Sequence, residues 1–157
     1  MKLLIISHTP HYKTNNEITG WGPTIIEINH LATLFDQVVH IAPLHSGENP
    51  NSSLPYTEPN IRFFPVSHSG GDKLFQKFDI LNKFPSYFRA LKDEMTTTDL
   101  IHIRCPAAIS IAGLIARIFW GRDKPCWVKY AGNWRPQGKE ALSYTLQRWW
   151  LRNFHKN

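Results

Sequence analysis

The stretch Lys2-Leu3-Leu4-Ile5-Ile6-Ser7 decides the fold. Its four middle residues are apolar without alternation, and the run is too short for a helix, which is typical of a strand buried on both faces. Thr9-Pro10 ends it. A strand of this kind predicts a parallel sheet that is covered by helices on both sides.

Further along the chain, short β-branched or apolar runs alternate with segments whose apolar residues recur at helical spacing. Such βαβ units are parallel and right-handed, so the sequence predicts an α/β fold: a Rossmann-like doubly wound parallel sheet, in three α/β/α layers, as a single domain over residues 1–157. The later strands are expected at 38–42, 61–66, 99–104 and 127–130. Helices are expected at 24–35, in the second half of 73–95, at 109–119 and at 140–154. Segments 8–23 and 44–60 are expected to be loops.

Composition limits the class of protein. The 157 residues are 42% hydrophobic and 19% charged, which is enough for one compact core and too apolar for disorder. No run approaches the roughly 18 apolar residues of a membrane span, and the first strand becomes polar too early for a signal peptide. We therefore expect a cytoplasmic protein.

Charge is distributed unevenly. The formal net charge is +6, and residues 124–157 hold seven Lys or Arg against Glu140 alone, so this tail accounts for the whole excess. A basic region favours phosphate-bearing ligands, nucleic acid or an anionic membrane surface. None of the residues forms a recognised nucleic-acid motif, so we expect no nucleic-acid partner.

The cysteines and histidines do not indicate a metal. Cys105 and Cys126 are too few for a disulfide scaffold, and the predicted strands separate them by roughly 10 to 15 Å, so two free thiols are expected. The eight histidines show no spacing that supplies a set of metal ligands. His102, inside an apolar strand, is expected to be a core histidine. Neither a metal nor another cofactor is predicted.

The order of elements resembles a known family. A first strand, a glycine-bearing loop, a helix with Leu31-Ala32-Thr33-Leu34 and a second strand with His40 resemble the N-terminal half of GT-B-fold glycosyltransferases of the family 4 type. The strand 99–104 with the helix 109–119 is similar to that family's fourth strand and helix. Residues 127–133 take the place of its fifth strand and the loop after it.

This resemblance implies that the chain is the acceptor-side domain and that the C-terminal donor-binding domain is absent. Such enzymes move a sugar from a nucleotide-sugar to a hydroxyl of a sugar or lipid-linked acceptor without a metal, using two facing domains. The isolated chain is therefore expected to be inactive. It carries Gly132-Asn133 where relatives commonly have a histidine.

Two groups of residues near the predicted strand ends are candidates for ligand binding, because ligands of such sheets bind beyond the carboxyl ends of the strands. Gly20, Trp21 and Gly22 precede a helix N-terminus, where free N–H groups favour a donor phosphate; the alternative is an ordinary loop. His8 and His11 flank the end of the first strand, where an imidazole contacts a sugar hydroxyl or acts as a base; they could equally be loop residues.

Further acceptor or cleft residues are expected at the ends of later strands and on the first helix. Arg104 offers a guanidinium for a phosphate or carboxylate. Asn133 can bond sugar hydroxyls, and Trp134 can stack on a sugar or simply cover the core. Glu27 can reach the cleft, although a solvated helix charge is the commoner explanation.

The last predicted helix combines Arg148, Trp149, Trp150 and Arg152, the mixture of cations and interfacial aromatics found in helices that lie on membranes. The same side chains would also suit a contact with the missing second domain. A competing function is therefore a non-catalytic Rossmann-like module that binds a phosphate ligand or docks on a membrane. In that case the protein would lie on the inner face of the membrane.

Overall fold

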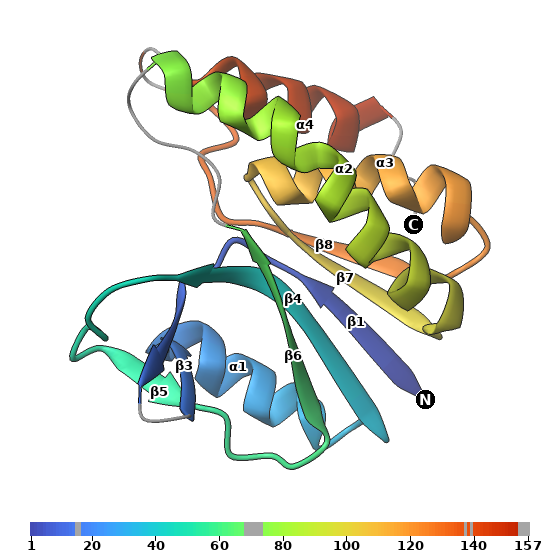
Figure 1. Cartoon of the computed structure of the whole chain (residues 1–157). Helices are drawn as coiled ribbons and strands as arrows, with labels where there is room; N and C mark the ends of the chain where they lie inside the picture. The colour runs from blue at the N-terminus through green and yellow to red at the C-terminus, as the bar shows by residue number, and fades with distance from the viewer. Residues whose placement is uncertain (15–16, 68–73, 137, 139, 154–157) are drawn as a thin grey trace.

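The computed structural model describes residues 1–14, 17–67, 74–136, 138 and 140–153 (Figure 1). Five parallel strands form the centre of one sheet, in the order β6-β4-β1-β7-β8. This is the predicted doubly wound arrangement, with the first strand in the middle. The five strands are β1 (Lys2–Ile6), β4 (Gln37–His45), β6 (Ile61–Ser67), β7 (Leu100–Cys105) and β8 (Cys126–Tyr130).

Helices cover both faces of the sheet, which confirms the three layers. In Figure 1, α1 (Gly22–Ala32) lies below the sheet, and α2 (Leu74–Thr97), α3 (Ala108–Trp120) and α4 (Leu142–Asn153) lie above it. The predicted bounds of α1, α3 and α4 agree to within a few residues, except that residue 154 lies outside the described residues. Helix α2 is longer than predicted and contains Pro85.

The two faces of β1 explain why its sequence does not alternate. Leu4 and Ile6 enter the larger core under α2 and α3, and Leu3 and Ile5 enter the smaller core against α1. All four side chains are fully buried. Burial on both faces requires an unbroken apolar run, so this stretch was sufficient to predict a central strand.

The predicted loop at 8–23 is wrong. It contains a hairpin of β2 (His11–Thr14) and β3 (Glu17–Trp21), and β2 continues along the edge of β4 beyond the end of β1, pairing His11 with Leu44. The sheet is therefore mixed and has eight strands. These strands were missed because polar side chains such as His11 and Thr19 are buried in them, so the usual apolar pattern is lacking.

The predicted loop at 44–60 is also partly wrong. Strand β4 does not end at Pro43 but continues to His45, and β5 (Ser53–Pro55) pairs with β3. Pro43 is tolerated because β1 pairs with β4 only as far as Ile41 and β2 resumes at Leu44. Along that edge, the N–H that proline lacks has no neighbouring strand to bond.

Candidate functional site

A cavity of about 480 Å³ lies at the carboxyl ends of the parallel strands. It is lined by residues that follow β1, the ends of β4 and β6, one residue of α2, the start of α3 and the first turn of α4. Strands β1 and β7 are neighbours, yet the chain leaves them toward opposite faces of the sheet, to α1 and α3. This is the topological switch point, where doubly wound folds bind ligands, and we name the space the switch-point cavity.

The walls of the switch-point cavity are mainly apolar, with prolines, alanines, isoleucines and Val66. The polar side chains at its surface are two imidazoles, two phenols and one hydroxyl. None of the described lining residues is Lys, Arg, Asp or Glu. A pocket of this kind suits a ligand that is uncharged where it touches the walls. The five polar residues are His8, His45, Tyr87, Ser143 and Tyr144.

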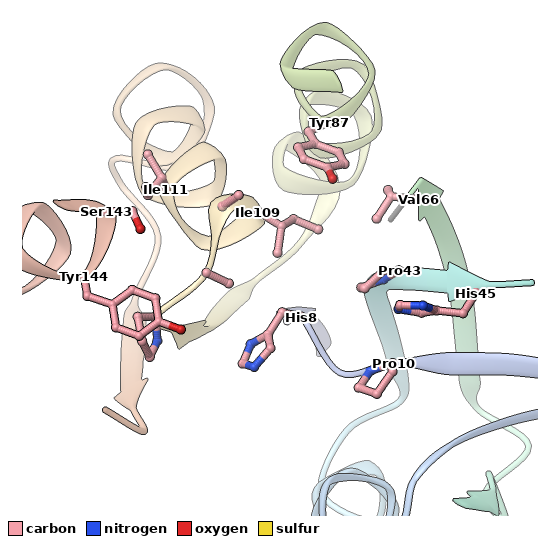
Figure 2. Close-up of a pocket in the computed structure, with 13 residues that line it drawn as sticks. His8, Pro10, Pro43, His45, Val66, Tyr87, Ile109, Ile111, Ser143 and Tyr144 are labelled. Atoms are coloured by element: carbon pink, nitrogen blue, oxygen red, sulfur yellow. The ribbon is translucent and has the colours of Figure 1, made fainter. Parts of the chain in front are cut away.

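His8 occupies the predicted position in the cleft. Figure 2 shows its imidazole pointing into the cavity between Tyr144 and Pro10. Partial desolvation, with the nearby positive charge of Arg104, lowers its pKa below the ordinary value. The ring is therefore neutral at pH 7, and a neutral imidazole can accept a hydrogen bond or a proton from a hydroxyl group.

Apart from His8, none of the lining residues was predicted as a site residue, and the two phenols are examples. Tyr87 lies in the helix predicted within 73–95 and Tyr144 in the helix predicted at 140–154, and neither has a distinctive sequence context. The hydroxyl of Tyr87 donates to the carbonyl of Ser67 at 2.8 Å, so the ring is held at the end of β6. Nothing in a local pattern could place either ring, because the cavity forms only when α2 and α4 pack on the sheet.

His11 does not lie in the cavity, contrary to the prediction. Its side chain is fully buried, and its Nδ1 is 2.8 Å from the carbonyl oxygen of Thr9. Its Nε2 is 2.7 Å from the hydroxyl of Tyr56, which is 2.6 Å from Nδ1 of His40. Desolvation lowers the pKa of His11 to about 4, so the ring is neutral at pH 7.

These contacts form a closed circuit of hydrogen bonds. Nε2 of His40 lies 2.7 Å from the hydroxyl of Ser7, which accepts from the backbone N–H of Thr9 at 3.2 Å. Since the carbonyl of Thr9 only accepts, His11 donates through Nδ1 and accepts from Tyr56 through Nε2. Tyr56 then accepts from His40, and His40 accepts from Ser7. Every member donates once and accepts once, so we name this set the histidine circuit.

The histidine circuit is buried and has a structural role. His40 and Ser7 are fully buried, and desolvation lowers the pKa of His40 well below its ordinary value and raises that of Tyr56. Substrate cannot reach the Ser7–His40 pair. The circuit instead connects the hairpin and the segment after β5 to the end of β1 and to the middle of β4.

The glycine loop is not an open phosphate cradle. Gly20 lies in β3, where a Cβ atom would stand 2.6 Å from Nε2 of His11. The N–H of Trp21 donates to the carbonyl of Pro10 at 3.3 Å, and that of Gly22 donates to Ser52 at 2.9 Å. Pro23 has no N–H. The donors expected to bind a phosphate are thus used within the fold, and Gly20 is required by the close approach of His11.

Arg104 and Glu27 meet outside the switch-point cavity. Nη1 of Arg104 is 2.8 Å from Oε2 of Glu27, and Nζ of Lys129 is 2.7 Å from the same oxygen. Burial raises the pKa of Glu27, but hydrogen bonds from Lys129 and Arg104 outweigh it, so the net shift is downward. The carboxylate stays ionised and partly neutralises both cations.

Asn133 and Trp134 also lie outside the cavity. Trp134 is 45% exposed, packs against Tyr130 with ring centroids 4.7 Å apart, and has the guanidinium of Arg152 5.7 Å above its ring. Arg152 also donates to the carbonyl of Trp134 at 2.9 Å. The backbone carbonyl of Asn133 accepts from Arg148 at 3.2 Å. These residues connect the end of β8 to α4.

Helix α4 presents only part of the predicted surface of cations and aromatics, since Trp149 and Arg152 are exposed and the other two residues are not. Arg148 is buried, pairs with the carboxylate of Glu140 and donates to the hydroxyl of Tyr130, so it is a structural residue and the expected membrane contact is wrong for it. Trp150 is partly buried against the larger core, whereas Trp149 is 52% exposed. The exposed stripe of α4 is therefore mostly apolar.

The remaining predictions concern thiols, metals and the core. Both cysteines are free, as predicted, and burial raises their pKa to about 12 for Cys105 and about 11 for Cys126. His102 is fully buried and stacks on Trp127 at 4.5 Å, which confirms a core histidine. Within the described ranges, no cluster of three potential metal ligands occurs, and no helix is long and apolar enough to cross a bilayer.

Comparisons with known proteins do not identify a family. No protein-family model matches the chain, and no curated protein matches it.

Proposed function

We propose that this chain is the acceptor-side domain of a GT-B-type glycosyltransferase and that the acceptor binds in the switch-point cavity. The observation that carries the proposal is the position of that cavity, at the carboxyl ends of β1 and β7, with the neutral imidazole of His8 inside it. The order of the parallel strands and the resemblance of the sequence support the same function.

The charges of the cavity lining indicate which of the two domains would bind which substrate. The switch-point cavity offers hydrogen-bonding groups to hydroxyls, and its described lining offers no cation to a phosphate. A nucleotide-sugar would therefore be held by a second domain, and His8 would accept the hydrogen bond of the attacking hydroxyl. We place the protein in the cytoplasm, on the side of the membrane where nucleotide-sugars are made available.

The test is a titration with methyl glycosides of glucose, galactose and mannose, monitored by NMR chemical shifts and tryptophan fluorescence. We expect at least one of them to bind and His8→Ala to weaken binding by up to about tenfold, since a hydrogen bond contributes roughly 0.5 to 1.5 kcal/mol. The matched control is His30→Ala, because His30 is exposed on α1 and does not line the cavity. The proposal fails if no glycoside binds, or if both variants bind as the wild type does.

A second candidate function is a module that docks on a membrane through α4. It is favoured by the exposure of Leu142 at 87%, of Leu146 at 49% and of Trp149 at 52%, which form one stripe of the helix. Sedimentation with phosphatidylcholine vesicles, with and without phosphatidylglycerol, tests it. Binding that is lost in Leu146→Asp, without any glycoside binding, would favour the module over the enzyme.

A further inference from the structure

We infer that the ligand of the switch-point cavity is uncharged and carries an alkyl or isoprenoid portion, which extends from the cavity into the space between α3 and α4. This rests on the proposed function only in calling the ligand a sugar acceptor. The evidence for its chemistry comes from the charges around the cavity and from a second, adjoining cavity.

The first step concerns charge. The described lining of the switch-point cavity holds no ionised side chain of Lys, Arg, Asp or Glu, and His8 is neutral. The cations near the strand ends already have carboxylate partners: Arg104 and Lys129 share Glu27, and Arg148 pairs with Glu140. A phosphate or carboxylate in the cavity would meet no cationic side chain of the described lining, so only hydroxyls and the backbone N–H groups at the start of α3 would offset the loss of its hydration. An uncharged ligand has no such cost.

The second step concerns an apolar cavity that adjoins the switch-point cavity. A cavity of about 110 Å³ lies between α3 and α4, lined by aliphatic residues of α3 and by Leu146, Trp149 and Trp150 of α4. Ile111 lines both this cavity and the switch-point cavity, so its side chain stands where they adjoin. We name the smaller space the α3–α4 groove.

The α3–α4 groove suits hydrocarbon rather than a hydroxylated group. Gln147 is its single polar lining residue among those described, and both ends of its amide are used. Its Oε1 accepts from the N–H of Ala107 at 3.1 Å, and its Nε2 donates to the carbonyl of Ser143 at 3.1 Å. A sugar in the groove would leave hydroxyls unpaired, whereas an alkyl chain would bury apolar surface.

The outer end of the path is also apolar. Leu146, which lines the groove, is half exposed, and Leu142 stands one turn before it on α4 and is almost fully exposed. A chain that enters the groove at Ile111 therefore reaches solvent across aliphatic side chains. Together, the two cavities give an amphipathic ligand a site for its polar end, beside His8, and a site for its tail.

The experiment measures Kd for a series of alkyl glycosides with methyl, butyl, hexyl and octyl chains, each below its micelle concentration. The sugar is the one that binds best in the panel above, or glucose if none binds. We expect each methylene that enters the groove to tighten binding by roughly threefold to fourfold. We expect Ile115→Trp to abolish this gain and to leave the affinity for the methyl glycoside unchanged, because Ile115 lines the groove and not the switch-point cavity.

The matched control is Ile118→Trp, because Ile118 lies on the same helix, is exposed and lines neither cavity. It should retain the full dependence on chain length. The wild-type series tests the inference by itself if Ile115→Trp does not fold.

The outcomes separate the inference from the proposed function. Equal affinity for methyl and octyl glycosides overturns the inference and leaves the function standing. If octyl phosphate binds more tightly than octyl glycoside, the inference that the ligand is uncharged is wrong. If 1-octanol binds as tightly as the octyl glycoside and Ile115→Trp weakens both equally, the sugar contributes nothing. The proposed function then fails, and the inferred chemistry of the ligand holds.

Discussion

Replacing Tyr56 by phenylalanine removes one oxygen atom from the centre of the histidine circuit. That oxygen donates to Nε2 of His11 at 2.7 Å and accepts from Nδ1 of His40 at 2.6 Å. Both histidine side chains are fully buried, so water does not replace the missing hydroxyl. The substitution thus leaves one buried acceptor and one buried donor without partners, and changes little else in the volume of the side chain.

The magnitude follows from these two groups. An unsatisfied buried polar group costs about 1 to 3 kcal/mol, so for two such groups we expect Tyr56→Phe to lower the free energy of unfolding by about 2 to 6 kcal/mol. This would be a large share of the roughly 5 to 15 kcal/mol that stabilises a typical domain. The loss should be greatest in the hairpin, because His11 lies in β2 and Tyr56 follows β5.

The assay is urea unfolding at pH 7.5 followed by circular dichroism, with amide hydrogen exchange to locate the loss. Tyr12→Phe is the matched control, because Tyr12 is half-buried in the same hairpin and none of its hydrogen bonds to described residues involves the hydroxyl. A loss below about 0.5 kcal/mol for Tyr56→Phe, the size of a neutral surface change, would refute the reasoning. So would equal losses for the two variants.

Three further predictions concern the same regions. First, the free energy of unfolding should fall as pH drops from 6.5 toward 4, because the unfolded chain takes up a proton near pH 6.5, whereas the folded pKa of His11 is about 4. His11 alone would account for about 3 kcal/mol over this range, and urea unfolding at pH 7, 6 and 5 that shows no change would contradict its neutral burial. Second, Gly20→Ala should destabilise the fold by about 1 to 3 kcal/mol, because the new Cβ would lie 2.6 Å from Nε2 of His11. Gly138→Ala, whose Cβ would meet nothing within 4 Å, should melt as the wild type does. Third, Cys105 and Cys126 should react with iodoacetamide at pH 8 only after unfolding in urea, because burial raises the pKa of each thiol. Rapid alkylation of both thiols in the folded protein would contradict this.

The strands and helices that the sequence predicted correctly share one property. In β1, β7 and α3, the buried residues are apolar except His102 and Ser110, so the period of the pattern reports the burial almost directly. The same pattern placed His102 in the core, since its neighbours on β7 are apolar on both sides. The hairpin was not predicted because it buries His11 and Thr19. Such polar residues are typical of loops, and only their hydrogen-bond partners explain why they are buried.

The sequence by itself determined the five parallel strands of the sheet and hence the edge at which the cavity forms. Alternating strands and helices permit only right-handed parallel crossovers, and these bring His8 to the switch point. The tertiary structure alone decided which polar groups remain available there. Glu27 and Arg104 are 77 positions apart in the sequence, yet they form an ion pair. Tyr56 hydrogen-bonds to the buried ring of His11, which therefore does not face the cavity. The periodicity of a sequence reports which residues share a face of one helix or strand. The partner of a charged or hydrogen-bonding side chain usually lies on another element, so contacts between elements decide whether that side chain remains available.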